Sequence, residues 1–301
     1  MTTGTMGRLE WALLLLLSVF WGASFFFYKL LVSLGPFTVV LGRMGIAAAV
    51  MIPVLYLRGG KLPALRTWMP YFVMALLGNV IPFSLFAYSE RHITSGLASI
   101  INATTPIFTV LVAHFWTHNE KLAWNKAVGV GFGLAGVIVL FGPAVLAGGK
   151  DVVGEACCLL ASISYGFAGV YGKRFAKEPL DQVVTCQLSA AALLVAPLAL
   201  MIEQPWTLSM PGAAVWASLA GIAVVSTVAA YLIYFHILAK AGATNISLVT
   251  FLVPVSGVFL GVAFLGESIS ATALAGIGVI ALGLAAIDGR PLGWMKRASA
   301  R

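Results

Sequence analysis

The sequence predicts an all-α membrane protein in which ten transmembrane helices form two inverted five-helix repeats around a central cavity. Three observations indicate this fold class: the composition, the number of apolar runs, and an internal repeat. Of the 301 residues, 60% are hydrophobic and only 9% are charged, and the mean hydropathy is +1.00. An ordinary soluble domain is about 25% charged. The composition therefore excludes a water-soluble globule.

Ten apolar runs are long enough to cross a bilayer. A hydrocarbon core of about 30 Å needs about 20 residues of helix. The expected spans, in chain order, are Leu9 to Leu31, Phe37 to Leu57, Trp68 to Ser89, Ser95 to Trp116, Ala123 to Phe141, Val152 to Gly172, Gln182 to Met201, Gly212 to Leu238, Ala243 to Leu265 and Ala271 to Ile287. No stretch remains between them for a separate soluble domain.

Turn residues and charges bound these spans. The first span follows Arg8 and lacks the small-residue cleavage site of a signal peptide, so we keep it as a membrane span. The clearest connections are Gly35-Pro36 before the second span, Arg58-Gly59-Gly60-Lys61 after it, Gly148-Gly149-Lys150-Asp151 before the sixth, Glu178-Pro179 before the seventh and Pro211-Gly212 before the eighth. Seven of the eight tryptophans fall near span ends, where such rings are favoured, and Trp21 is the exception near the middle of the membrane.

The distribution of Lys and Arg predicts the orientation. With ten spans, both termini lie on one side of the membrane. Fourteen Lys and Arg residues fall in the loops and tails of that side, against Lys29, Arg91 and Lys150 on the other. Cytoplasmic loops carry such an excess. We therefore expect a bacterial inner (plasma) membrane protein with both termini in the cytoplasm.

An internal repeat divides the chain into halves. Ser18, Trp21-Gly22 and Lys29 recur 144 residues later as Ser162, Tyr165-Gly166 and Lys173, and Ser99 and Pro106 recur 148 residues later as Ser247 and Pro254. The expected units are a first repeat over residues 1–146, a second over 147–290 and a cytoplasmic tail over 291–301. Since each half has an odd number of spans, the second enters the membrane from the opposite side, as in carriers that work by alternating access.

These residues carry a resemblance to a known family. Trp21-Gly22 with Lys29, Pro36 with Arg43, and Pro106 followed by Glu120 resemble the EamA-type repeat of the drug/metabolite transporter superfamily, and the second half repeats the pattern with Pro254 and Glu267. The resemblance covers about residues 9 to 288, but Gln187 stands where the second half would match Arg43. It implies a transporter. Within the family the sequence looks closest to a bacterial amino-acid exporter, which implies aromatic and other neutral amino acids as substrates.

Polar and aromatic residues near the middle of the spans are the candidate substrate-binding residues, since polar groups in hydrocarbon usually face the bundle interior, a water-filled path or a partner. They are Trp21, Asn79, Ser99, Asn102, Tyr165, Thr227, Tyr231 and Thr250. They place the cavity wall on the first, third, fourth, sixth, eighth and ninth spans. The alternative for each hydroxyl is a bond to the carbonyl one turn back or to a neighbouring helix, and for Trp21 it is core packing.

Arg43, Pro106 and Pro254 are candidate gating or hinge residues. A proline within a span removes a helical hydrogen bond and frees a carbonyl, although a static kink is the alternative. Arg43 lies six residues into the second span, where it either snorkels to the interface or faces the bundle. Glu120 and Glu267 each precede a span, so they either cap that helix or act as gates between the halves.

The expected function is secondary transport. No GxxxxGK[ST] motif is present for ATP hydrolysis, and no carboxylate falls near the middle of a span to hold a cationic drug. A zwitterion therefore fits better, with lipids and a small molecule as partners and without nucleic acid, an obligate protein partner, a metal or a cofactor. The alternatives are export of other metabolites or drugs, or an intramembrane enzyme. Proton coupling and facilitated diffusion both remain open.

Overall fold

In the computed structural model, which describes residues 6–117, 123–147 and 151–288, the chain folds into helices and connecting turns. Within that part, nine helices are long and apolar enough to cross a membrane, and the shorter apolar helix Val249–Leu265 makes the tenth. The all-helical, ten-span fold class is therefore confirmed. The transmembrane segments are α1 (Arg8–Leu30), α2 (Pro36–Leu57), α3 with α4 (Met69–Ala75, Ile81–Ser89), α5 with α6 (Ser95–Asn102, Thr105–Trp116), α7 (Trp124–Ala147), α8 (Asp151–Tyr171), α9 (Leu180–Leu198), α10 with α11 (Ala213–Ala223, Ala230–Ala241), α12 with α13 (Ala243–Ile246, Val249–Leu265) and α14 (Ala271–Asp288).

Four segments are interrupted, and they are equivalent in pairs. The third and eighth contain π-helical turns at Leu76–Val80 and Val224–Ala229. The fourth and ninth break between α5 and α6 and between α12 and α13. Pro106 follows the first break directly, at the start of α6, whereas Pro254 lies inside α13. The two prolines therefore do not make equivalent interruptions, because the ninth segment breaks earlier along its length.

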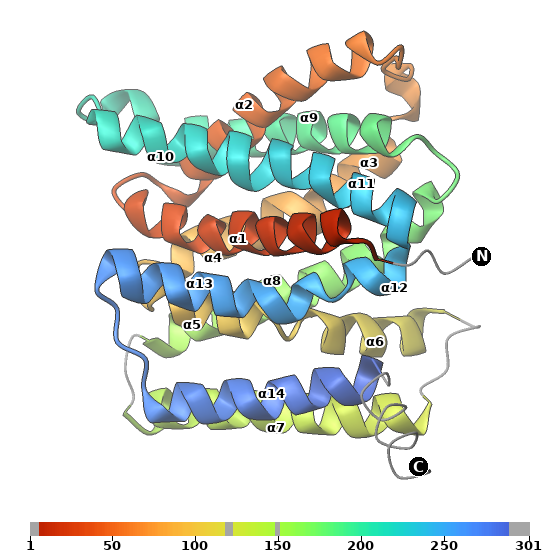
Figure 1. Ribbon diagram of the computed structural model, residues 1–301. Coiled ribbons are helices and arrows are strands. Elements are labelled where there is room, and N and C mark those ends of the chain that lie inside the picture. Colours follow the sequence, from red (N-terminus) through yellow and green to blue (C-terminus); the bar gives the residue numbers. More distant parts are fainter. Residues whose placement is uncertain (1–5, 118–122, 148–150, 289–301) are drawn as a thin grey trace.

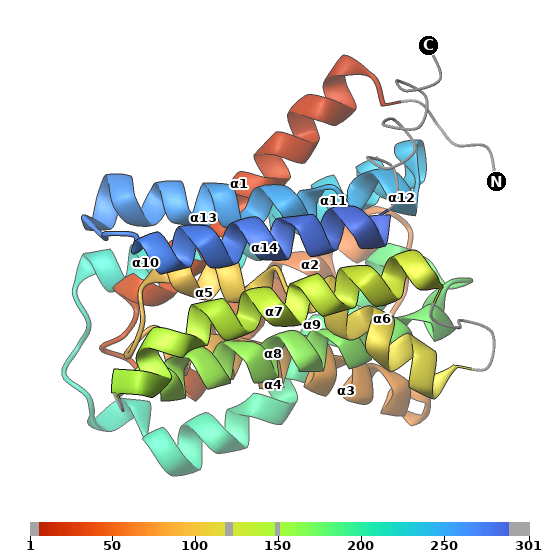
Figure 2. The same ribbon diagram turned by 90° about the horizontal axis from the view of Figure 1, so that it is seen from below.

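The helices pack in pairs that a twofold axis would exchange. α1 packs on α13, and its repeat equivalent α8 packs on α6. α2 packs on α9, and α7 packs on α14, so each of these pairs joins equivalent helices. Figure 1 shows α7 and α14 at one edge of the bundle with α2 and α9 at the other, and Figure 2 shows α7 and α14 side by side. This pairing is the one expected if the halves are related by a pseudo-twofold axis.

Two glycines of the repeat lie at equivalent helix contacts. A Cβ added to Gly22 of α1 would lie 2.8 Å from the backbone nitrogen of Gly257 in α13. A Cβ on Gly166 of α8 would lie 2.9 Å from the backbone carbon of Phe108 in α6. Close backbone approach of this kind is how membrane helices associate tightly. The repeated glycine is thus explained by helix packing.

Replacing Gly22 or Gly166 by valine is expected to lower the melting temperature of the purified protein. The added side chain forces α1 away from α13, or α8 away from α6, and overpacking of this kind costs about 1–3 kcal/mol. Gly131→Val is the matched control, because a Cβ there meets nothing within 4 Å. Thermal unfolding followed by size-exclusion chromatography measures the effect. Equal losses in all three variants would contradict the packing account.

Candidate functional site

A cavity of about 570 Å³ lies between the helices of the two halves. Small-molecule sites usually fall between about 300 and 1,000 Å³. We call the end where α1 begins and α14 ends the terminal end, and the opposite one the far end. The lining reaches Ala176, Leu180 and Leu238 at the terminal end, and its deepest residues toward the far end include Tyr28 and Arg43. The cavity is therefore accessible from the terminal end.

Arg43 is the one charged residue among the described residues that line this cavity. Arg43 is 3% exposed, and its guanidinium donates from Nε to Thr227 Oγ1 (2.9 Å) and from Nη1 to the Tyr28 hydroxyl (2.8 Å). Its central carbon lies 3.8 Å from the centre of the Phe83 ring. These bonds hold the guanidinium inside the bundle, so Arg43 does not snorkel to the interface.

A second bond mirrors the one between Arg43 and Thr227. Gln187, at the position of α9 equivalent to Arg43, donates from Nε2 to Asn79 Oδ1 (2.5 Å). Asn79 and Thr227 lie in the π-helical turns of the third and eighth segments. π-helical turns are frequent at functional sites. Each half therefore sends one long side chain from its second helix to the π turn of the other half, and only the first of these side chains is charged.

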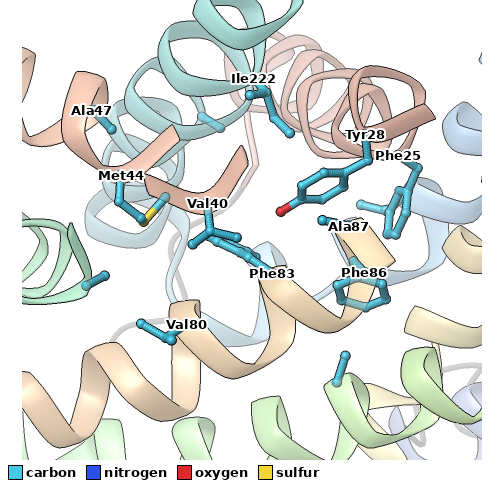
Figure 3. Packing of buried hydrophobic residues seen from close by; sticks show 14 of the residues in the cluster. Phe25, Tyr28, Val40, Met44, Ala47, Val80, Phe83, Phe86, Ala87 and Ile222 are labelled. Atoms are coloured by element: carbon cyan, nitrogen blue, oxygen red, sulfur yellow. The ribbon is translucent and has the colours of Figure 1, made fainter. Parts of the chain in front are cut away.

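Aromatic rings form the walls of the cavity. Trp21 of α1 lies 5.7 Å from Tyr234 of α11, measured between ring centres. Tyr165 of α8 lies 6.1 Å from Phe86 of α4. Figure 3 shows Tyr28 pointing from α1 toward Phe83, with Phe86 beside them on α4. The deep part of the cavity thus presents ring faces around a single cation.

Six of the predicted site residues line the cavity and five do not. Those in the lining are Trp21, Arg43, Asn102, Tyr165, Tyr231 and Thr250. Asn79, Ser99, Thr227, Pro106 and Pro254 are outside it. The polar atoms of Ser99 and Thr227 are bonded to other groups of the protein: Ser99 Oγ donates to the Gly96 carbonyl (2.7 Å), and Thr227 bonds Arg43 and the Ile222 carbonyl. Asn79 Oδ1 accepts from Gln187, while its Nδ2 has no hydrogen-bond partner among the described residues.

All six predicted wall segments contribute, and two further segments were missed. Arg43 comes from the second, and Leu180, Val183, Val184 and Gln187 come from the seventh. Phe83 and Phe86 were missed as well. The two rings lie three residues apart, a spacing that places both on one face of α4 and could have revealed them.

At the far end, cationic side chains of the first half bind backbone carbonyls of the same half. Lys29 Nζ donates to the carbonyls of Glu90 (2.7 Å) and Ile93 (2.8 Å), and Arg91 Nη2 donates to the Leu34 carbonyl (2.7 Å). Free carbonyls at helix ends and in loops are good partners for such cations. These bonds join α1 and the residues that follow it to the connection between α4 and α5.

Two carboxylates of the second half cap helices of the first half. Glu203 accepts from the backbone nitrogens of Phe37 (2.9 Å) and Thr38 (2.7 Å), at the start of α2. Glu267 accepts from the backbone nitrogens of Ser95 (2.8 Å) and Gly96 (3.0 Å), at the start of α5. Unsatisfied N–H groups make helix N-termini favourable for carboxylates. We call these contacts the far-end clamps.

Glu267 therefore does not cap the helix that follows it, which was one expectation. Gly266 has a φ of +66° and ends α13 in a left-handed turn, a conformation that glycine adopts without strain. The turn directs Glu267 toward α5 rather than α14. Glu120, the equivalent residue of the first half, lies outside the described residues.

Comparison with known proteins agrees with this architecture. The sequence model of the EamA-like transporter family matches residues 9–142 and 152–287. The chain belongs to the EamA-like transporter family. Its two matched segments cover nearly all of the described helices, so this EamA-like protein is an integral membrane transporter.

Relatives of this EamA-like transporter occur in several kingdoms. It is 28% identical over 267 residues to the uncharacterized inner membrane transporter YedA of Escherichia coli, covering 88% of this chain and 85% of YedA. It is 27% identical to the uncharacterized transporter YoaV of Bacillus subtilis, covering 80% and 83%. It is 25% identical to the chloroplastic WAT1-related protein At3g02690 of Arabidopsis thaliana, covering 90% and 67%. A solved crystal structure shares the fold, with a TM-score of 0.65 at 20% identity over 92% of this chain and 96% of the other.

Proposed function

We propose that this transporter exports small neutral metabolites, foremost aromatic and other neutral amino acids, and that Arg43 binds the substrate carboxylate. The observation that carries the proposal is a single buried cation in the lining of a cavity walled by aromatic rings. A buried charge is costly unless it is paired. A substrate carboxylate would supply the missing counter-charge.

The rest of the lining suits the remainder of an amino acid. The oxygens of Asn102, Thr250 and Tyr231 offer acceptors for an ammonium group. The rings of Trp21 and Tyr165 offer surface for a large apolar side chain. A cationic drug fits less well, because no carboxylate belongs to the described lining and Arg43 would repel it.

Transport would proceed by alternating access between the halves 1–146 and 147–290. The structure is open at the terminal end and clamped at the far end. Exchange of conformation between inverted repeats would release the clamps and close the terminal end. Pro106, beside the break in the fourth segment, and Pro254 in the ninth are the proposed hinges.

Counterflow in proteoliposomes tests the substrate class. Vesicles loaded with unlabelled phenylalanine should take up labelled phenylalanine, and vesicles without protein should not. Phenylalaninamide, which lacks the carboxylate, should compete weakly, because a hydrogen bond to a charged group contributes about 1.5–3 kcal/mol, or roughly ten- to a hundredfold in affinity. Competition by the amide equal to that of phenylalanine would remove the assigned role of Arg43.

Both termini are expected to be cytoplasmic, because fourteen Lys and Arg residues lie on their side against three on the other. Fusion of a cytoplasm-active fluorescent reporter to the C-terminus should give signal, and fusion of a periplasm-active phosphatase should not. The two reporters control for each other's expression. Strong phosphatase activity would show that the orientation is the reverse of the expected one, so that the cavity opens to the outside.

A further inference from the structure

Glu90 is a buried carboxylate without a hydrogen-bond partner among the described residues. It follows the last residue of α4, and its side chain is 0% exposed. Neither of its carboxylate oxygens accepts a hydrogen bond from the described residues. An ionised carboxylate so placed is strongly destabilised, and protonation relieves the cost. In this conformation Glu90 is therefore best accommodated as the neutral acid.

The charged and titratable groups around Glu90 come from every neighbouring element. Lys29 and Tyr28 approach from α1, Glu267 from the connection before α14, and Cys158 from α8. Glu155 of α8 acts on Cys158 in turn. α2 also packs against α4, and its charged residue in this part of the bundle is Arg43, which is bonded to Tyr28. His92 follows on the same connection and packs on Tyr88. Burial raises the pKa of the Glu90 carboxyl well above its usual range, with Lys29 opposing the rise and Glu267 adding to it.

The short connection between α4 and α5 carries Glu90 and leads directly into one far-end clamp, at the start of α5. Lys29 gives two of its hydrogen bonds to the carbonyls of Glu90 and Ile93, and Glu267 holds the backbone nitrogens of Ser95 and Gly96. Glu267 belongs to the second half, so opening the far end must detach it from this connection. Water that entered at the opened far end would hydrate Glu90 and so lower the cost of its ionised form.

We propose that Glu90 is a proton-binding site that is filled while the Glu267 clamp is closed and emptied when the far end opens. The inference rests on the alternating access proposed above. Tyr28, bonded to Arg43, separates Glu90 from the cavity, and Glu90 is not part of the cavity lining. The proton is therefore exchanged with the far side only. It sets the balance between conformations and does not cross the membrane.

The sign of the effect follows from linkage. A carboxyl whose pKa is raised in the clamped conformation stabilises that conformation at low pH, and this contribution is lost as the pH rises through the raised pKa. In the open conformation a hydrated glutamate has a pKa of about 4.3. Between these two pKa values, the ratio of open to clamped molecules rises by up to about tenfold per pH unit.

Hydrogen–deuterium exchange on the full-length protein in lipid nanodiscs, without substrate, measures this balance. The probes are peptides that contain the backbone amides of Ser95 and Gly96, and separately those of Phe37 and Thr38. After correction for the intrinsic exchange rate, protection in the parent should fall as the pH rises from about 5 to 8.5, a range above the ordinary carboxyl pKa. Glu90→Gln should remain protected throughout, and Glu90→Asp should restore the pH dependence.

Glu155→Gln is the matched control, because Glu155 is also buried in this region and has an oxygen without a partner. It should keep the pH dependence of the parent. Protection that is independent of pH in the parent, or pH dependence that survives Glu90→Gln, would overturn the proposal. If a pH gradient drove the accumulation of amino acid, the statement that Glu90 exchanges its proton with the far side only would be overturned. Since the exchange measurement uses no substrate, a failure of amino-acid transport would leave its result interpretable.

Discussion

Arg43→Lys and Arg43→Gln are both expected to reduce amino-acid counterflow severalfold or more at normal membrane abundance. The guanidinium donates from two different nitrogens to Thr227 and Tyr28, and its plane lies over the Phe83 ring. A lysine keeps the charge, but its single nitrogen cannot reproduce this planar arrangement. A glutamine keeps polar atoms but loses the charge that would pair with the substrate. Initial rates in proteoliposomes, normalised to reconstituted protein, measure the loss.

Arg58 is exposed, so Arg58→Lys is the matched control and should transport like the parent. Thr227→Val and Tyr28→Phe remove the acceptors of the guanidinium and retain its charge. We expect intermediate losses from both, because Arg43 would then be present but less well oriented. Parent-like transport by Arg43→Lys would show that charge alone suffices there, and Arg43 would lose its place as a geometric binding residue.

The helices could be predicted from the sequence because hydropathy alone decides where a chain crosses a bilayer. The first span was expected over Leu9 to Leu31 and is found at Arg8–Leu30, and the tenth was expected over Ala271 to Ile287 and is found at Ala271–Asp288. The segment that differs most is the ninth, where the break after α12 leaves Val249–Leu265 as its apolar part. Hydropathy averaged over a window of about 19 residues does not register such a break, because the apolar residues of α13 dominate the average.

The candidate site was harder to predict because polar residues in a membrane helix have two kinds of partner. Trp21 and Tyr165 were identified by their place in the repeat, and both line the cavity. Asn79 and Thr227 were identified by their polarity, but their π-helical turns direct them to Gln187 and Arg43 rather than into the cavity. A π-helical turn changes the helix face of every later residue. The spacing of apolar residues in the sequence did not indicate either turn.

Buried carboxylates at the helix ends were the least predictable feature. Glu90 and Glu155 both fall within a turn or two of a span end, where a sequence reading places them in contact with water. The structure buries both, because residues distant in sequence pack around them: Glu267 lies near Glu90, and Gly154, beside Glu155, packs against Ser89 and His92. Under the alternating access proposed above, their burial would depend on the conformation of the transporter as well as on its fold, and a linear sequence does not specify which conformation is present.

Trp21→Ala and Tyr165→Ala are expected to lower counterflow of phenylalanine much more than counterflow of alanine. Both rings line the cavity, and they stand on separate walls: Trp21 beside Tyr234, and Tyr165 beside Phe86. Truncating a buried aromatic contact costs about 1–3 kcal/mol, and a large apolar substrate makes more of that contact than a small one. The ratio of the two initial rates, measured in the same vesicles, reports the effect.

Trp206→Ala is the matched control, because Trp206 is 66% exposed and lies outside the cavity lining. It should leave the ratio of phenylalanine to alanine transport unchanged. The ratio also separates a binding role from a structural one, since partial unfolding lowers both rates together. Equal losses for alanine and phenylalanine in Trp21→Ala and Tyr165→Ala would therefore assign the two rings to the scaffold, and the cavity would select its substrates by the carboxylate alone.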